Sequence, residues 1–159
     1  MSRIESHNSS SPLFLYVAYQ APHFPIMEPP ASYLKMYSGP QHNSMRWRGA
    51  LNRPATISAL DAGVGEIVAS LKRSGLWENS VLLFSTDNGG PVKASSNLPL
   101  RGTKESLYEG GVRGVALLAG GALPLSTRQP QPRQYNQYVA SSLQPRVLLI
   151  LMLQVDLHH

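Results

Sequence analysis

Cysteine is absent from this chain of 159 residues, and charged residues make up only 14% of it. Without cysteine the chain can form no disulfide, no thiolate zinc site and no thiol nucleophile. The formal net charge is +5, but the basic residues are scattered along the chain rather than gathered in a run. Scattered cations permit attraction to sulfated or phosphorylated anions, and they do not predict a nucleic-acid partner.

Long hydrophobic runs are also missing. The first eleven residues are polar and rich in serine, so no signal peptide is expected in them. The apolar run at 147–153 is far too short to cross a bilayer, so we expect no membrane span. Asn8, Ser9 and Ser10 match a glycosylation acceptor, which matters only if the chain is secreted.

Short apolar runs predict three strands. Leu13 to Tyr19 is a continuous apolar and aromatic run, which predicts a strand buried on both faces. A second buried strand is expected over 81–85, and a third over 112–119.

Apolar residues at helical spacing predict a helix over 56–73, between the first two strands. Asn52, with Pro54 just inside, is the expected start, and Gly75 is the expected end. A strand, a helix and a strand in this order form a right-handed crossover in a parallel sheet. The expected fold is therefore α/β, with mainly parallel strands and flanking helices. The predicted apolar stripe of the helix consists of Ile57, Leu60, Val64, Ile67, Val68 and Leu71.

Polar residues follow two of the predicted strands. His23 comes shortly after the first strand, and Asp87 and Asn88 come directly after the second. If these strands are parallel, the three side chains emerge at the same edge of the sheet, where sites form in open α/β folds. A carboxylate beside an amide carbonyl suits a hard cation such as calcium or magnesium. The alternative is an ordinary Asx–Gly turn over 87–90 and an ordinary loop histidine.

A second polar segment, LPLRGTKESLYEGGVRG, spans Leu98 to Gly114. Lys104 can hold an anionic ester oxygen as a point donor, and Arg101 can offer a bidentate fork. The alternative is a solvated basic loop that is followed by a glycine turn.

Three segments together resemble the sulfatase family, most closely its arylsulfatase B branch. They are PLFLYVAYQAPHFP, ISALDAGVGEIVASLKRSGLWENSVLLFSTDNGG and LPLRGTKESLYEGGVRGVALLAG, in the order of the family. The resemblance covers Pro12 to about Gly120 and implies a partial alkaline-phosphatase/sulfatase-like sheet.

The resemblance also implies roles for individual residues. Asp87 and Asn88 match a pair of calcium ligands, and Lys104 matches the lysine that contacts the sulfate ester. His23 matches the histidine that holds or protonates the leaving-group oxygen, and Arg101 is expected to support substrate binding. The family hydrolyses sulfate esters, so the implied partner is a sulfated small molecule or glycan, including glycosaminoglycan sugars. Family members are lysosomal or extracellular, which is the implied localisation.

The chain departs from the family in its nucleophile. Relatives convert a cysteine to formylglycine, and this chain has neither that cysteine nor the Asp-Asp pair that completes the calcium shell. We therefore expect a fragment that lacks the N-terminal formylglycine segment and is inactive by itself. The expected organisation is a polar segment over 1–11, a partial catalytic domain over 12–123 and an unrelated, disordered tail over 124–159.

Two alternatives stay open. One is a pseudoenzyme fragment that binds a cation or a sulfated glycan without turnover. The other is a related phosphoryl or phosphonate hydrolase, which the segments around Lys104 and Gly110 disfavour because they are specifically sulfatase-like.

Overall fold

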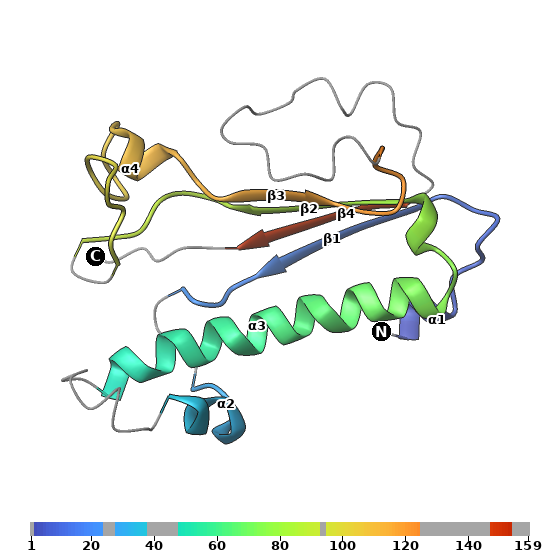
Figure 1. Cartoon of the computed structure of the whole chain (residues 1–159), viewed down its shortest axis with the longest axis horizontal. Coiled ribbons are helices and arrows are strands. Elements are labelled where there is room, and N and C mark those ends of the chain that lie inside the picture. Colours follow the sequence, from blue (N-terminus) through green and yellow to red (C-terminus); the bar gives the residue numbers. More distant parts are fainter. Residues whose placement is uncertain (1, 24–27, 38–47, 93–94, 125–146, 154–159) are drawn as a thin grey trace. The chain divides into compact units, whose positions relative to one another are not determined.

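The structure is a computed structural model that describes residues 2–23, 28–37, 48–92, 95–124 and 147–153 (Figure 1). In chain order its elements are α1 (Ser2–Glu5), β1 (Leu13–Tyr19), α2 (Ala31–Met36), α3 (Arg48–Arg73), the 3-10 turn η2 (Trp77–Asn79), β2 (Ser80–Thr86), α4 (Glu109–Val112), β3 (Ala116–Ala119) and β4 (Val147–Leu153).

The described residues belong to two compact units. The first consists of Met1–Val17, Glu66–Phe84 and Leu117–Leu151 and carries the larger part of every strand. The second consists of Ala18–Gly65, Ser85–Ala116 and Met152–His159.

The four strands form one sheet in the order β1-β4-β2-β3. The arrows of β1, β4 and β2 point the same way in Figure 1, and β3 runs against them. Thr86 donates its N–H to the Val115 carbonyl at 2.9 Å, and Ala122 donates to the Ser80 carbonyl at 3.2 Å, as antiparallel pairing requires. The predicted α/β class with mainly parallel strands is therefore confirmed, and so is the parallel direction of the first two strands.

The strand β4 occupies a central position in this sheet, although its residues fall in the segment predicted to be a disordered tail. For 147–153 that prediction is wrong. Leu151 is fully buried, because a strand with a neighbour on each side lies inside the sheet. The rest of the predicted tail beyond Pro124 lies outside the described residues.

The strand β1 has the predicted bounds but not the predicted burial. Its residues alternate between half-buried and exposed, and Phe14 and Tyr16 are 63% and 51% exposed. Successive side chains of a strand point to opposite faces of the sheet, so the exposed residues of β1 share one open face. In β2, by contrast, Val81 and Leu82 are buried.

The helix α3 starts earlier than predicted, at Arg48, and runs through Pro54 for 26 residues. A proline this near the start of a long helix removes one backbone bond but leaves the later turns intact. Thr56 is buried, and its hydroxyl donates to the Asn52 carbonyl at 2.7 Å.

The predicted end of α3 at Gly75 is confirmed. Gly75 has a positive φ of 66°, and its N–H donates to the Lys72 carbonyl at 3.1 Å. The N–H of Leu76 donates to the Leu71 carbonyl at 2.9 Å, which completes a Schellman cap. On the predicted stripe Leu60, Ile67 and Leu71 are buried, whereas Ile57 is 45% exposed.

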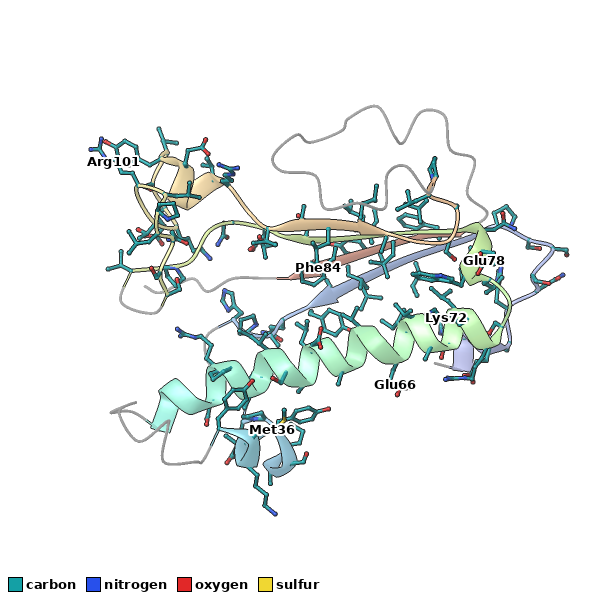
Figure 2. All side chains as sticks on the ribbon, in the orientation of Figure 1. Met36, Glu66, Lys72, Glu78, Phe84 and Arg101 are labelled. Atoms are coloured by element: carbon teal, nitrogen blue, oxygen red, sulfur yellow. The ribbon has the colours of Figure 1, made fainter. Side chains whose placement is uncertain are left out.

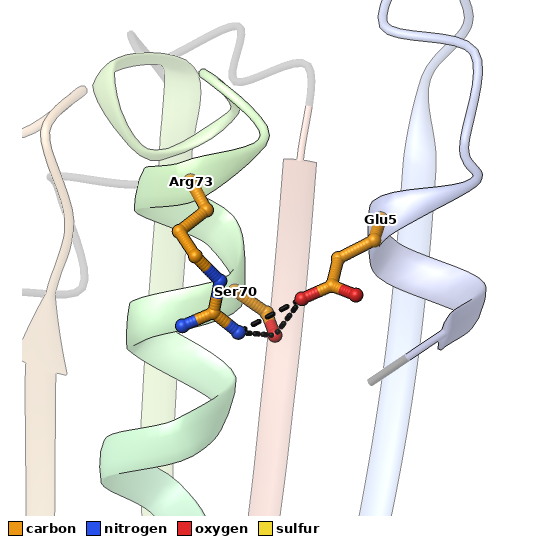
Figure 3. Close-up of polar contacts among 3 residues, drawn as sticks. All are labelled: Glu5, Ser70 and Arg73. Atoms are coloured by element: carbon orange, nitrogen blue, oxygen red, sulfur yellow. Dashed lines mark hydrogen bonds and ion pairs between the residues drawn. The ribbon is translucent and has the colours of Figure 1, made fainter.

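The core of the first unit also includes the N-terminal segment that was predicted to be merely polar. Glu5 of α1 accepts hydrogen bonds from Ser70 at 3.2 Å and from Arg73 at 2.8 Å (Figure 3). These contacts join α1 to the last turns of α3. The buried apolar residues of this unit are Ile4, Ile67, Leu71, Leu76, Val81, Leu82, Leu123 and Leu151.

The predicted third strand over 112–119 is shorter than expected. Only Ala116–Ala119 form β3, and Glu109–Val112 form the short helix α4. Gly110 and Gly111 are buried against other backbone segments, so this part of the chain turns instead of extending. Since the connection from β2 holds no long crossover helix, β3 pairs with β2 in the antiparallel direction.

Candidate functional site

Asp87 and Asn88 stand where β2 ends, in the second unit. Asp87 is exposed and Asn88 is half-buried. Asn88 donates its Nδ2–H to the Gly89 carbonyl at 2.8 Å, so Oδ1 is the atom of this side chain that suits a cation. The prediction that these two residues follow the carboxyl end of a strand is confirmed.

The loop after Asp87 and Asn88 folds back on itself and brings Lys104 to this turn. Gly90 accepts the backbone N–H of Lys104 at 3.0 Å, and Gly89 donates to the Gly111 carbonyl at 2.9 Å. The two predicted site segments, DNGG and LRGTK, are therefore hydrogen-bonded to each other.

Close backbone approach explains the glycines of this loop. A Cβ atom on Gly89 would lie 2.8 Å from the carbonyl carbon of Gly110 and nearer still to its oxygen. Such a contact lies below the range that real Cβ atoms occupy, so only glycine fits at this position.

Lys104 lines a small pocket of about 110 Å³ together with Pro91, Val92 and Glu105. A cavity of this size admits several water molecules, and therefore a small oxyanion. Glu105 adopts a positive φ of 74°, a left-handed conformation that is strained for any residue other than glycine. The strained residue is the immediate neighbour of the predicted sulfate-contacting lysine.

Arg101 is exposed, and its guanidinium lies over the Tyr108 ring, 4.0 Å from the ring centroid. Figure 2 shows the Arg101 side chain at the outer end of the loop region that carries α4. The stack holds the cation against an aromatic face, which suits a supporting contact to an anionic ligand.

His23 is half-buried and follows β1, in the same unit as Asp87 and Lys104. Its backbone N–H donates to the Gln20 carbonyl at 2.8 Å, which forms a tight turn just after the strand. Because β1 and β2 run in the same direction, His23 and Asp87 both follow carboxyl ends at one edge of the sheet. Convergence of the His23 side chain on Lys104 stays a prediction.

Calcium needs more ligands than the described residues bring together. Asp87 and Asn88 offer two side chains, whereas calcium takes about six to eight oxygen ligands. Across the described ranges, no three His, Asp or Glu side chains are grouped as a metal site would group them. The described residues by themselves therefore do not complete a calcium site.

One structural residue of this loop escaped the sequence analysis. Asn97 makes hydrogen bonds to the backbone of Gly90 and Gly102 through its side-chain amide. No motif or periodicity marks it, because its partners are backbone groups that only the folded loop brings near.

No helix of the described residues is both long enough and apolar enough to cross a membrane.

Comparison with known proteins shows to which family the chain is similar. The Sulfatase family model matches residues 2–151. Mouse arylsulfatase J is 39% identical over 116 residues, which are 72% of this chain and 18% of that protein. Human arylsulfatase A is 30% identical over 117 residues, 71% of this chain and 21% of the relative.

A solved structure agrees with the sequence relatives. The crystal structure of Ps i-CgsB in complex with k-i-k-neocarrahexaose aligns with a TM-score of 0.57 at 33% identity. The alignment covers 66% of this chain and 22% of that one.

The chain belongs to the sulfatase family. It spans about a fifth of the length of the relatives that it matches, 18% of arylsulfatase J and 21% of arylsulfatase A. The family match extends to residue 151 and so includes most of β4, inside the segment that was expected to be unrelated.

Proposed function

We propose that this chain forms part of the sulfate-ester site of a sulfatase, with Lys104, Asp87 and Asn88 at its centre. The observation that supports this most directly is the hydrogen bond from the Lys104 N–H to the Gly90 carbonyl, at 3.0 Å. It ties the lysine segment to the turn that follows Asp87 and Asn88. Sulfatase relatives imply sulfuric ester hydrolysis as the general chemistry.

The proposed roles follow from the charge of each group. Lys104 holds a negatively charged sulfate oxygen, and Arg101 adds a second cation farther out. Cations that are already in place when charge develops stabilise a transition state without further reorganisation. His23 holds or protonates the leaving-group oxygen, as a histidine near neutral pH can do. We infer that Asp87 and Asn88 are two members of a calcium ligand set that other residues complete.

The proposed substrate is a sulfated glycan. Mouse and rat N-acetylgalactosamine-6-sulfatases are among the relatives, and the aligned crystal structure holds k-i-k-neocarrahexaose, a sugar ligand by its name. We extend this to glycosaminoglycan sugars for the present chain, acting in a lysosomal or extracellular compartment.

One observation favours a second candidate, binding without turnover. The chain contains no cysteine and so no cysteine precursor of formylglycine. A site that lacks its nucleophile loses most of its rate, because the catalytic groups act as a unit. We therefore propose that the isolated chain binds sulfate weakly and does not hydrolyse sulfate esters.

The test combines a binding and a turnover measurement on the purified chain. Sulfate is titrated with and without calcium chloride while backbone amide shifts are recorded, and a chromogenic aryl sulfate is supplied separately. Lys104→Ala should weaken sulfate binding at least tenfold, and Asp87→Ala should remove any enhancement by calcium.

Lys72→Ala is the matched control. Lys72 is an exposed lysine, whereas Lys104 is half-buried, and Lys72 lies 5.4 Å from the centroid of the Trp77 ring, in the first unit. Equal sulfate affinity in wild type, Lys104→Ala and Lys72→Ala would refute the proposed site. Turnover that both Lys104→Ala and Asp87→Ala abolish would instead refute the proposal that the chain is inactive.

A further inference from the structure

The side-chain amide of Asn97 holds parts of the loop between β2 and α4 together. Its Oδ1 accepts the Gly90 N–H at 2.8 Å, and its Nδ2 donates to the Gly90 carbonyl at 2.9 Å. The same Nδ2 donates to the Gly102 carbonyl at 3.3 Å. Asn97 is half-buried, so part of this network is screened from water.

The contacts of the Asn97 side chain require an amide group. The carboxamide carries an acceptor and two N–H donors on one planar group, and here both kinds of atom meet backbone partners. An aspartate of the same shape would keep the acceptor for the Gly90 N–H. It would also place a charged oxygen against the carbonyls of Gly90 and Gly102, where a donor is needed. An alanine would lose all the contacts.

The hydrogen bonds of Asn97 reach both segments of the candidate site. Gly90 closes the turn that begins with Asp87, and Gly102 stands two residues before Lys104. The Gly90 carbonyl accepts both the Asn97 amide and the Lys104 N–H. Gly102 has a positive φ of 88°, so the chain reverses there just before the lysine. The amide therefore contacts the backbone on both sides of the junction that places Lys104 beside the Asp87 turn.

We propose that Asn97 is a positioning residue for sulfate binding, which acts by holding the Lys104 segment in register with the turn after Asp87. This inference rests on the proposed function of Lys104. Asn97 does not itself contact the anion; its loss leaves the lysine in the chain but no longer held at the turn.

The experiment compares the full chain with Asn97→Asp, Asn97→Ser and Ser96→Ala, and the probe is inorganic sulfate. Ser96→Ala is the control, because Ser96 is exposed and its hydroxyl oxygen accepts the Leu98 N–H at a long distance of 3.4 Å. Asn97→Ser removes the carboxamide but keeps a small, uncharged polar side chain, and it serves if the charged variant does not fold. Amide shifts, sulfate affinity and hydrogen exchange of Gly90 and Lys104 are measured on each, beside the free energy of unfolding.

The expected result is at least a tenfold loss of sulfate affinity in the Asn97 variants, with the Lys104 amide no longer shifting on sulfate addition. Exchange at Gly90 and Lys104 should be faster even without sulfate, and Ser96→Ala should behave as wild type. Wild-type sulfate affinity in Asn97→Asp or Asn97→Ser overturns the proposal.

Failure of the proposed function would look different. In that case the wild-type chain would bind no sulfate, and the positioning role would fall with it. Exchange at Gly90 and Lys104 in the sulfate-free variants then separates the two errors. Unchanged exchange means that the amide does not hold the loop either, whereas faster exchange means that only the assignment to sulfate was wrong.

Discussion

Substitution of Gly89 by alanine tests the backbone packing on which the candidate site depends. The added Cβ would lie 2.8 Å from the Gly110 carbonyl carbon and 3.4 Å from the Gly111 Cα, with the Gly110 oxygen nearer than either. All these obstacles are backbone atoms, so no flexible side chain can move aside. The turn after β2 and the segment before β3 must therefore separate.

The magnitude follows from this geometry. Inserting a methyl group into a well-packed place costs about 1–3 kcal/mol. Separation of the two segments also weakens the Gly89 N–H bond to the Gly111 carbonyl, worth about 1 kcal/mol. Alanine restricts the unfolded chain more than glycine, which returns about 0.4–1 kcal/mol. The expected net loss in the free energy of unfolding is about 2 kcal/mol.

Gly65→Ala is the matched control for this substitution. Gly65 lies inside α3, and a Cβ there would meet no atom within 4 Å. Alanine in a helix interior is favoured over glycine by about 0.5–1 kcal/mol, so this variant should be more stable than wild type.

Urea unfolding of wild type, Gly89→Ala and Gly65→Ala provides the assay, with amide exchange at residue 89, whose N–H donates to the Gly111 carbonyl, as a local measure. The two alanine variants should shift the midpoint in opposite directions, and exchange at residue 89 should be faster only in Gly89→Ala. If Gly89→Ala were as stable as wild type, with unchanged exchange at residue 89, the close approach of the two segments would be wrong.

Three other predictions concern single side chains. Hydrogen bonds from Arg73, and then from Ser70, hold the pKa of Glu5 below its ordinary value of 4.5. Their contribution to the free energy of unfolding is therefore present above pH 4.5 and is lost as the pH falls through the lower pKa of the folded state. Glu5→Gln should thus unfold more easily than wild type near pH 7, and the difference in urea midpoint should vanish in acid; a constant difference would contradict this. Glu105→Gly should be about 1 kcal/mol more stable than Glu105→Ala, because only glycine adopts the left-handed φ without strain; thermal unfolding of both variants measures this, and equal stability would count against the strain. Burial raises the pKa of Tyr19 above 10.0. The contribution of the neutral Tyr19 to the free energy of unfolding is therefore fully present below that pH and is lost as the pH rises through the pKa of the folded state. Phenolate absorbance of wild type and Tyr19→Phe checks this, and titration of Tyr19 at its ordinary pKa would refute it.

Local chemistry explains what could be read from the sequence. The bounds of β1 follow from an apolar run between Pro12 and Gln20. These two residues are local signals, which need no contact with a distant segment. The end of α3 follows from Gly75, whose left-handed conformation caps the helix through neighbouring carbonyls. The site segments around Asp87 and Lys104 were found by motif, and the family match supports the resemblance that they indicated.

Contacts between distant segments decided the features of the fold that the sequence did not predict. The apolar run at 147–153 is short and ambiguous by itself, and only the sheet shows that it lies between β1 and β2. Phe14 and Tyr16 are exposed on one face of β1 despite a pattern typical of a buried strand, because the sequence does not show which face of a sheet other elements cover. The early start of α3 was missed because Pro54 is a local signal for a helix boundary, and the short β3 was missed because the backbone contacts that bury Gly110 and Gly111 form only in the folded chain.

The sequence by itself determined the family, the class of fold and the chemical types of the candidate site, because these depend on motifs and on periodicity along the chain. The tertiary structure alone decided which segments meet: β4 beside β2, α1 against the end of α3, and Lys104 against the turn after Asp87. The role of Asn97 belongs to the second group. Its amide is one of many polar side chains until the loop folds and places two backbone segments within hydrogen-bonding distance of it.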